Sequence, residues 1–309
     1  MINNFITVFL QVVSLFLMMS FGFFGQRFKM ITEQGSQVIT DITMFFVTPC
    51  LIINSFIREF DSAKLKELFI VLVAAILIHA ASILLVNIIF KGNKNAVNCV
   101  LRFGIVFSNV GYMGIPLQEA VLGDDGVFFG AAYVAVFQLV LWSYGIVCMS
   151  GDRKYLSAKR LIINPGIIGT VIGLIVFVTS LQIPYVFRNV ISSMASLNTP
   201  LAMIVVGFFL AKSDILAAFR AKRTYIAAAF RLIVIPLLTL GALYIVGLKG
   251  TVSLSIIISS SAPIAAATSM FASKFKKDTA CASNLVAITT VLSIITMPFI
   301  VALAQIIFN

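Results

Sequence analysis

The stretch Phe107–Leu117, which reads FSNVGYMGIPL, places potential ligand-binding residues inside a segment that is otherwise apolar enough to cross a bilayer. It contains the amide of Asn109 together with Gly111, Gly114 and Pro116. Glycine and proline weaken a helix, and main-chain N–H and C=O groups that are freed at membrane depth are costly unless protein, ligand or water satisfies them. The stretch therefore predicts a broken helix and a binding site.

The chemistry that this break predicts is anion binding. A broken helix leaves the N-terminus of its second half inside the protein, with unpaired N–H groups and a partial positive charge. A carboxylate can accept hydrogen bonds from these groups and from Asn109 without requiring a buried full positive charge. We expect Gly111 and Pro116 to shape this site, and Tyr112 and Met113 to form its apolar or aromatic wall.

A second break is predicted around Pro263, which follows a run of small and polar residues just as Pro116 does. A discontinuous helix needs such residues because they can satisfy freed main-chain groups. We expect the two broken helices to cross near the middle of the membrane, where Ser260, Ser261 and Thr268 would supply hydroxyl groups from the second half of the chain.

Composition places these breaks in an all-α polytopic membrane protein. The chain has 309 residues, of which 61% are hydrophobic and 11% charged, and its mean hydropathy is +1.09. Apolar stretches of about 20 residues, the length that crosses a bilayer as helix, recur along the sequence. They predict ten transmembrane helices: 4–25, 36–56, 68–90, 99–121, 126–150, 166–184, 188–211, 224–247, 251–274 and 279–308.

Basic residues test this count, because they accumulate in alternate, cytoplasmic loops. One side would carry Arg27, Lys29, Lys91, Lys94, Arg102, Arg153, Lys154, Lys159, Arg160, Lys212, Arg220, Lys222, Arg223, Lys274, Lys276 and Lys277. The other side would carry Arg58, Lys64, Lys66, Arg188 and Lys249. We expect both termini on the extracytoplasmic side of the cell membrane. The net charge of +11 is spread over short loops, so it indicates no nucleic-acid partner.

The sequence also predicts an internal repeat. Thr48–Pro49 in the second span matches Thr199–Pro200 in the seventh, and Pro116 in the fourth matches Pro263 in the ninth. Each half holds five spans, and an odd number places the halves in opposite orientations, as in many secondary transporters. We expect a first repeat at residues 1–150, a cytoplasmic linker at 151–165 and a second, inverted repeat at 166–309.

Two ionisable residues inside predicted spans are candidates for ion coupling, since charge is rarely buried in a membrane without a role. His79 is the only histidine, and its ordinary pKa of about 6.5 suits proton coupling, although a histidine bonded within a helix bundle is the alternative. Arg231 either attracts the substrate anion or pairs with a carboxylate or a helix end.

Enzymatic functions find no support in the sequence. It has no GxSxG, HExxH, P-loop or dinucleotide-binding glycine pattern, and no cluster of His, Cys or carboxylate residues that predicts a metal or another cofactor. Because no nucleotide site is predicted either, transport would have to run downhill or on an ion gradient.

At the residue level, the segment Ser108–Leu117 resembles the fourth-helix signature of the auxin efflux carrier family. The segment Pro263–Asp278 is similar to the family's ninth-helix region, and VTPCLIINSF and LNTPLAMIVVGFFLA are similar to its second and seventh helices. The resemblance covers essentially the whole chain. Two departures are a short linker, Gly151–Pro165, without the long hydrophilic insertion of many plant members, and Ala267 and Thr268 where many relatives have a second proline or an amide.

This resemblance implies an elevator-type carrier and a homodimer. Helices 3–5 and 8–10 would form the moving transport domain, helices 1, 2, 6 and 7 the scaffold and dimer contact, and Asn109 the main ligand of the substrate carboxylate. We therefore expect a secondary transporter or uniporter for a small organic anion such as malate or malonate, with protons as the coupling ion and sodium less favoured. The alternatives are a sodium-coupled bile-acid-type symporter and a ligand-sensing receptor with a carrier fold.

Overall fold

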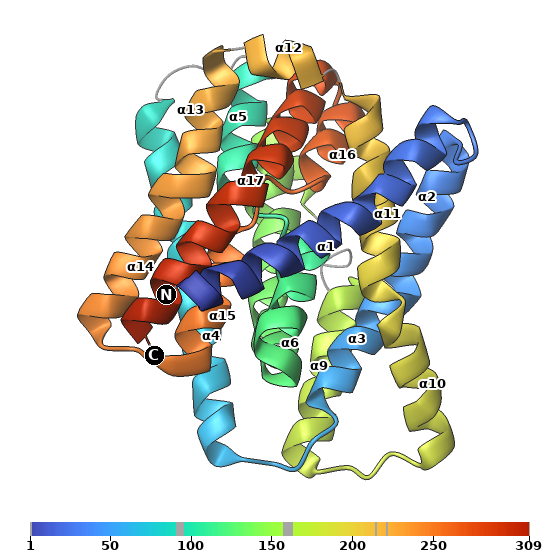
Figure 1. Ribbon diagram of the computed structural model, residues 1–309, viewed down its shortest axis with the longest axis vertical. Coiled ribbons are helices and arrows are strands. Elements are labelled where there is room, and N and C mark those ends of the chain that lie inside the picture. Colours follow the sequence, from blue (N-terminus) through green and yellow to red (C-terminus); the bar gives the residue numbers. More distant parts are fainter. Residues whose placement is uncertain (1, 91–95, 157–162, 214, 221, 309) are drawn as a thin grey trace.

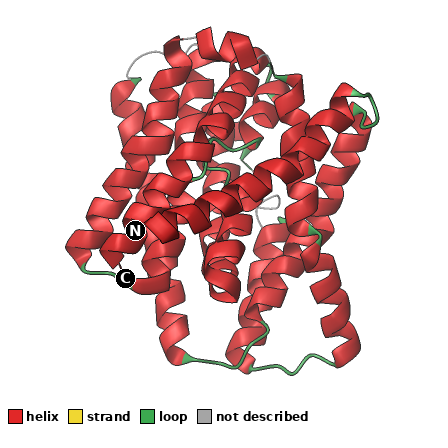
Figure 2. Cartoon of the chain, viewed as in Figure 1, coloured by secondary structure: helices red, strands yellow, loops and turns green. Residues whose placement is uncertain are grey.

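The computed structural model describes residues 2–90, 96–156, 163–213, 215–220 and 222–308, and helices dominate it, with no strand among these residues (Figure 2). Lys91, Lys94, Lys159, Arg160 and part of the expected linker lie outside the described residues. The longer helices are α1 (Ile2–Arg27), α2 (Glu33–Ile42), α3 (Thr48–Phe56), α4 (Ser62–Ile89), α5 (Ala96–Val106), α6 (Ile115–Val140), α9 (Pro165–Thr179), α10 (Tyr185–Ser196), α11 (Asn198–Lys212), α13 (Lys222–Ala229), α14 (Ile235–Val246), α15 (Gly250–Ser261), α16 (Ala267–Lys274) and α17 (Thr279–Phe308). Short helices are α7 (Ile146–Ser150), α12 (Ile215–Arg220), the π-helical turns η1 (Thr43–Val47), η2 (Val110–Gly114), η3 (Leu141–Gly145) and η5 (Phe230–Val234), and the 3-10 turn η4 (Arg153–Tyr155).

Within the described ranges, 7 helical segments are long and apolar enough to cross a membrane, and the segments 97–106, 165–179 and 250–261 are shorter apolar helices. The segment Val110–Ser150 is 41 residues long, more than one crossing needs. Gly123 has φ 64° and ψ −149° and so interrupts α6 beside Asp124 and Asp125, where the sequence predicts a tight join between two spans. The predicted class, an all-helical multi-pass membrane protein, is confirmed.

The connecting loops gather at two opposite ends of the bundle (Figure 1). Segment α12 lies at the top of the view and the loop from α1 to α2 at the upper right, whereas the loops α3–α4 and α9–α10 lie at the bottom and the loop α14–α15 at the lower left. Arg27 and Lys29 belong to the first set of connections, and Arg188 and Lys249 flank the second. The fold therefore separates these two pairs of basic residues, as the alternating charge pattern predicts for residues of opposite loops.

Helix α1 crosses α11 at very short distance because two glycines leave room for the neighbouring backbone. A Cβ atom on Gly207 would lie 1.9 Å from the carbonyl oxygen of Met19, and one on Gly22 would lie 2.0 Å from that of Ile204. Small residues at helix crossings allow such close packing in membranes, where water does not drive helices together. Helix α3 packs in turn against α9 and α10.

Inside the bundle, the chain leaves helical geometry after α5 and again after α15, and the two non-helical segments run antiparallel beside each other. The main-chain nitrogen of Asn109 donates to the carbonyl oxygen of Pro263 over 2.7 Å, and that of Ala265 donates to the carbonyl oxygen of Phe107 over 2.9 Å. Main-chain groups that the helices no longer pair are thus satisfied by the opposite segment. This pairing defines the junction of residues 107–109 with residues 262–266.

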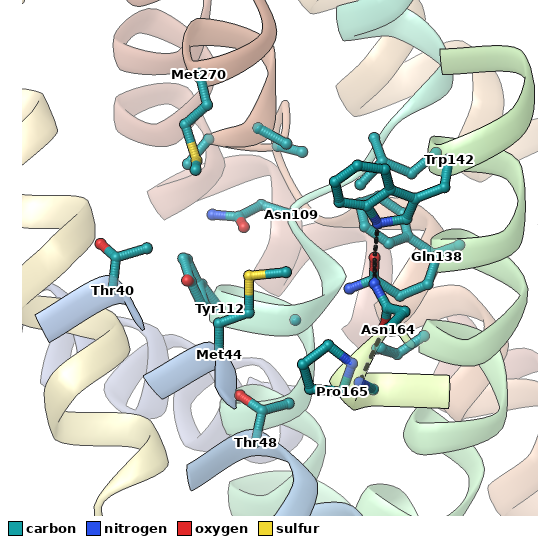
Figure 3. Close-up of a pocket in the computed structure, with 18 of the residues that line it drawn as sticks. Thr40, Met44, Thr48, Asn109, Tyr112, Gln138, Trp142, Asn164, Pro165 and Met270 are labelled. Atoms are coloured by element: carbon teal, nitrogen blue, oxygen red, sulfur yellow. Dashed lines mark hydrogen bonds between the residues drawn. The ribbon is translucent and has the colours of Figure 1, made fainter. Parts of the chain in front are cut away.

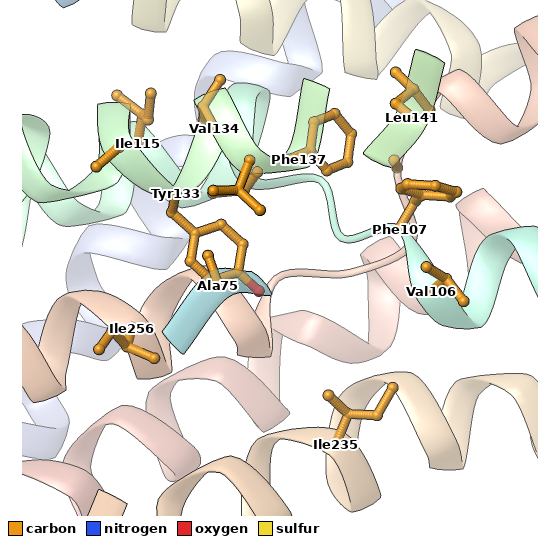
Figure 4. Close-up of a cluster of buried hydrophobic side chains, with 14 of the residues drawn as sticks. Ala75, Val106, Phe107, Ile115, Tyr133, Val134, Phe137, Leu141, Ile235 and Ile256 are labelled. Atoms are coloured by element: carbon orange, nitrogen blue, oxygen red, sulfur yellow. The ribbon is translucent and has the colours of Figure 1, made fainter. Parts of the chain in front are cut away.

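An aromatic core supports the junction (Figure 4). Phe107 and Phe137 meet edge to face with ring centroids 5.6 Å apart, and Tyr133 lies 5.5 Å from the ring of His79. These side chains are buried and come from three elements, α4, α6 and the junction itself. Tight packing of this kind restricts side-chain movement, so the aromatic core holds Phe107 in place at the junction.

Candidate functional site

A cavity of about 780 Å³ lies against the junction (Figure 3). Its walls come from the starts of η2, α9 and α16, from α6 and η3, and from α2, η1 and the start of α3. Gln37, Asp41 and Lys274 line it and are exposed, so the cavity opens at the end of the bundle where α2 begins and α16 ends. Most of the remaining wall is apolar or aromatic, as is usual in small-molecule sites.

The junction presents two polar side chains to this cavity, those of Ser108 and Asn109, and the amide of Asn109 is the larger (Figure 3). Asn109 is 5% exposed, and its Nδ2 atom has no hydrogen-bond partner among the described residues. The main-chain carbonyl oxygen of Asn109 accepts from Met113 N at 2.9 Å and from Gly114 N at 3.1 Å, which fixes the backbone at the start of η2. Because buried polar groups are normally paired, this anchored donor is a position for a ligand acceptor.

Two helix N-termini reach the same cavity. Gly111 and Tyr112, in the first turn of η2, line it, and so do Ala266 and Ala267 at the start of α16. The N–H group of Ala266 has no hydrogen-bond partner among the described residues. The first amides of a helix lack intrahelical acceptors and carry partial positive charge, so this wall favours an anion.

The opposite wall carries an amide cluster that the sequence did not predict (Figure 3). The Oε1 atom of Gln138 accepts from Trp142 Nε1 at 3.2 Å and from Asn164 Nδ2 at 3.4 Å. These bonds orient the amide, so its Nε2 atom remains a donor. Asn164 also accepts from the N–H of Gly166 at 2.9 Å and caps α9. Asn164 before Pro165 is a sequence signal of a helix start, but nothing local placed it beside Gln138.

The residues predicted to bind substrate divide into two groups. Asn109, Gly111 and Tyr112 line the cavity. Met113 does not line the cavity and lies in a buried cluster with side chains of α1 and α11, against which Tyr112 also packs. Pro116 is buried in the first turn of α6, where its missing N–H costs least.

The predicted residues of the second half also lie behind the cavity wall. The hydroxyls of Ser260 and Ser261 each donate over 3.1 Å to a carbonyl one turn earlier in α15. Pro263 contributes its carbonyl oxygen to the junction, and Thr268 is fully buried with no partner for its hydroxyl in the described structure. Each helix has one face towards the cavity and one away from it, and sequence spacing alone did not show which residues lie on which face.

A buried polar network joins the two halves next to these serines. Gln118, fully buried in α6, accepts from Ser255 Oγ at 2.6 Å and donates to Ser259 Oγ at 3.0 Å. Each of the three side chains has a hydrogen-bond partner in this network, so the network fixes α6 against α15.

The two coupling candidates both lie outside the cavity wall. His79 is 2% exposed, its Nδ1 atom is 2.7 Å from the carbonyl oxygen of Ala75, and its ring contacts Phe137, which does line the cavity. Arg231, in η5, is 1% exposed and donates from Nη1 to the carbonyl oxygen of Ile105 at 3.2 Å and from Nη2 to that of Ser260.

The family follows from comparison with known sequences. The profile of a family described as membrane transport protein matches residues 7–301, nearly the whole chain. The chain belongs to this family. The resemblance to auxin efflux carriers that the fourth-helix motif indicates is thereby confirmed, and the chain is a multi-pass membrane protein of a transporter family.

Two archaeal relatives align with almost the full length of the chain. An uncharacterized transporter of Methanocaldococcus jannaschii is 21% identical over 287 residues, which are 89% of this chain and 92% of the relative. An uncharacterized transporter of Methanothermobacter thermautotrophicus is 21% identical over 296 residues, or 93% and 95% of the two chains. The similarity thus spans the junction and the cavity rather than one segment.

Proposed function

We propose that this protein is a secondary transporter or uniporter that moves a small organic anion, a carboxylate such as malate or malonate, across the cell membrane. The observation that carries the proposal is the unpartnered Nδ2 atom of Asn109, which lies in a cavity that two helix N-termini also line. A carboxylate would accept from Asn109 and from first-turn amides such as that of Ala266.

The charge of the cavity suits weak and reversible binding. Lys274 is the one lysine or arginine among the lining residues and Asp41 the one carboxylate, and both are exposed. The inner wall therefore attracts an anion through partial charges and amide donors. A carrier has to release its substrate, and partial charges bind a carboxylate less tightly than a buried full cation would.

The architecture in this proposal is ten transmembrane helices in two inverted five-helix repeats, 1–150 and 166–309, with broken helices 4 and 9 crossing at the junction. Two observations support it. The interruptions pair through main-chain hydrogen bonds, and Thr48 Oγ1 donates to Asn198 Oδ1 over 3.1 Å, which joins the two Thr-Pro segments that the repeat relates. Helices 1, 2, 6 and 7 form the scaffold and dimer contact, and helices 3–5 and 8–10 the moving domain.

The cavity opens at the end of the bundle that carries Arg27 and Lys29. The positive-inside rule assigns that end to the cytoplasm and both termini to the outside. The conformation described is then inward-open, and an elevator movement of the transport domain carries Asn109 towards the other side. Protons are the proposed coupling ion, and His79 is the proposed coupling group. Normal transport with unchanged pH dependence in His79→Gln would exclude this role of His79.

The test of the site begins with a thermal-shift panel of carboxylates on the purified protein, because a ligand that binds the folded state raises its unfolding temperature. The best carboxylate is then followed as uptake into proteoliposomes. Asn109→Ala is expected to abolish both signals while unfolding at a temperature close to wild type. The matched control is Asn189→Ala, which removes an exposed amide on α10 that does not line the cavity. Unchanged uptake by Asn109→Ala would refute the site.

A further inference from the structure

Arg231 is a buried charge whose described partners are main-chain carbonyl groups. Its side chain is 1% exposed, and none of the ion pairs in the described part of the chain includes it. An isolated guanidinium inside a membrane protein is costly, so its surroundings have to supply compensating negative charge. The residue also does not line the cavity, which argues against direct contact with a substrate.

The compensating charge comes from two helix ends. Ile105 lies in the last turn of α5 and Ser260 in the last turn of α15, the two helices that stop at the junction. The last four carbonyl groups of a helix lack intrahelical donors, and each helix C-terminus carries about half a negative charge. Two such ends offset about one positive charge, which a single guanidinium provides.

The shape of the side chain matters as much as its charge. Arginine presents donors in a rigid planar fork, and here Nη1 and Nη2 reach carbonyl oxygens on two different helices from opposite halves of the chain. A lysine ammonium is a compact point charge on a flexible stem and would not bridge the two acceptors with the same fixed geometry.

We infer that Arg231 is a positioning residue that clamps the C-terminal ends of α5 and α15 together and so holds the junction that presents Asn109 to the cavity. The inference rests on geometry and stands whether or not the ligand is a carboxylate. The guanidinium offsets the negative C-terminal ends of α5 and α15 on one side of the junction. The positive N-termini of η2 and α16 face the cavity on the other side.

Hydrogen–deuterium exchange, read by mass spectrometry on the full-length protein, tests this clamp without any ligand. The reporters are the amides of Asn109 and Ala265, which form the two junction hydrogen bonds. Arg231→Met is expected to raise exchange at both by at least about ten-fold, because hydrogen bonds to charged groups are among the stronger contributions to stability. Arg231→Lys is expected to give an intermediate increase.

Thr239→Val is the matched control. It removes a buried hydroxyl from α14, the helix that follows η5, where Thr239 donates to Ile235 O over 2.9 Å. It should leave both junction amides protected. If Arg231→Met does not survive purification, Arg231→Gln and Arg231→Lys carry the test. Unchanged protection at the junction, or a uniform rise in exchange along the whole chain, would overturn the inference.

Discussion

The main-chain nitrogen of Asn109 donates a 2.7 Å hydrogen bond to the carbonyl oxygen of Pro263, although the two residues lie in opposite halves of the chain. Proline has no N–H to offer, but its carbonyl remains an acceptor, and Asn109 uses its own backbone here while its side chain faces the cavity. One residue thus serves both the junction and the candidate site.

The junction predicts a contrast between two neighbouring proline substitutions. Ala265→Pro removes the N–H that donates to Phe107 O and leaves a buried carbonyl unpaired, at a cost of about 1–3 kcal/mol. Ala266→Pro removes an N–H with no described acceptor, at a φ of −56° that proline adopts. Thermal unfolding in detergent should show a clear loss of stability for the first and a small change for the second; equal losses would argue against the pairing.

The contributions of Gln118, Ser255 and Ser259 to stability should depend on one another. Gln118→Leu leaves the hydroxyls of Ser255 and Ser259 buried without their partner, and we expect a loss of about 1–3 kcal/mol per unsatisfied group in unfolding experiments. Adding Ser255→Ala and Ser259→Ala should recover part of this loss, because removing all the polar partners together is less costly than removing one. A triple variant less stable than Gln118→Leu would contradict the network.

The crossing of α1 and α11 depends on Gly207. In Gly207→Ala the new Cβ would lie 1.9 Å from Met19 O, so the helices must move apart, and we expect destabilisation of about 1–3 kcal/mol from overpacking. Gly241→Ala is the control, since a Cβ there meets no atom within 4 Å. Because alanine favours helix, this control should be neutral or slightly stabilising in the same thermal unfolding assay. Identical behaviour of the two variants would rule out the close contact.

At the end of the bundle opposite the cavity mouth, Arg58 Nη1 lies 2.5 Å from Asp125 Oδ1, and Lys64 contacts the same carboxylate. The side chains of Arg58 and Asp125 are 19% and 35% exposed, so solvent screens the pair in part. A double-mutant cycle with Arg58→Gln and Asp125→Asn should give a coupling of about 1 kcal/mol that falls at high salt.

The comparison for this cycle is the pair Lys154–Asp152, whose side chains are 70% and 44% exposed. Its coupling should be close to zero because the solvent screens it more strongly. A salt-independent coupling for Arg58 and Asp125, or one no larger than that of the control pair, would disprove a stabilising role for this contact.

Local sequence determined the class of this protein and the position of its interruption. Apolar stretches of bilayer length make helices the available way to satisfy the backbone in lipid, and the residues around Asn109 and Pro263 mark where those helices weaken. The same local pattern was enough to find three residues of the cavity wall, Asn109, Gly111 and Tyr112. The family resemblance also lay in these short motifs.

The tertiary structure decided which faces of those helices meet the cavity. Met113 lies in the buried cluster with α1 and α11 while its neighbour Tyr112 reaches the cavity, and spacing does not reveal which direction faces a neighbour. Asn164 meets Gln138 from a separate helix, and Arg231 meets two helix ends distant in sequence. Such contacts depend on how helices pack in three dimensions, so they become visible only once the chain has folded.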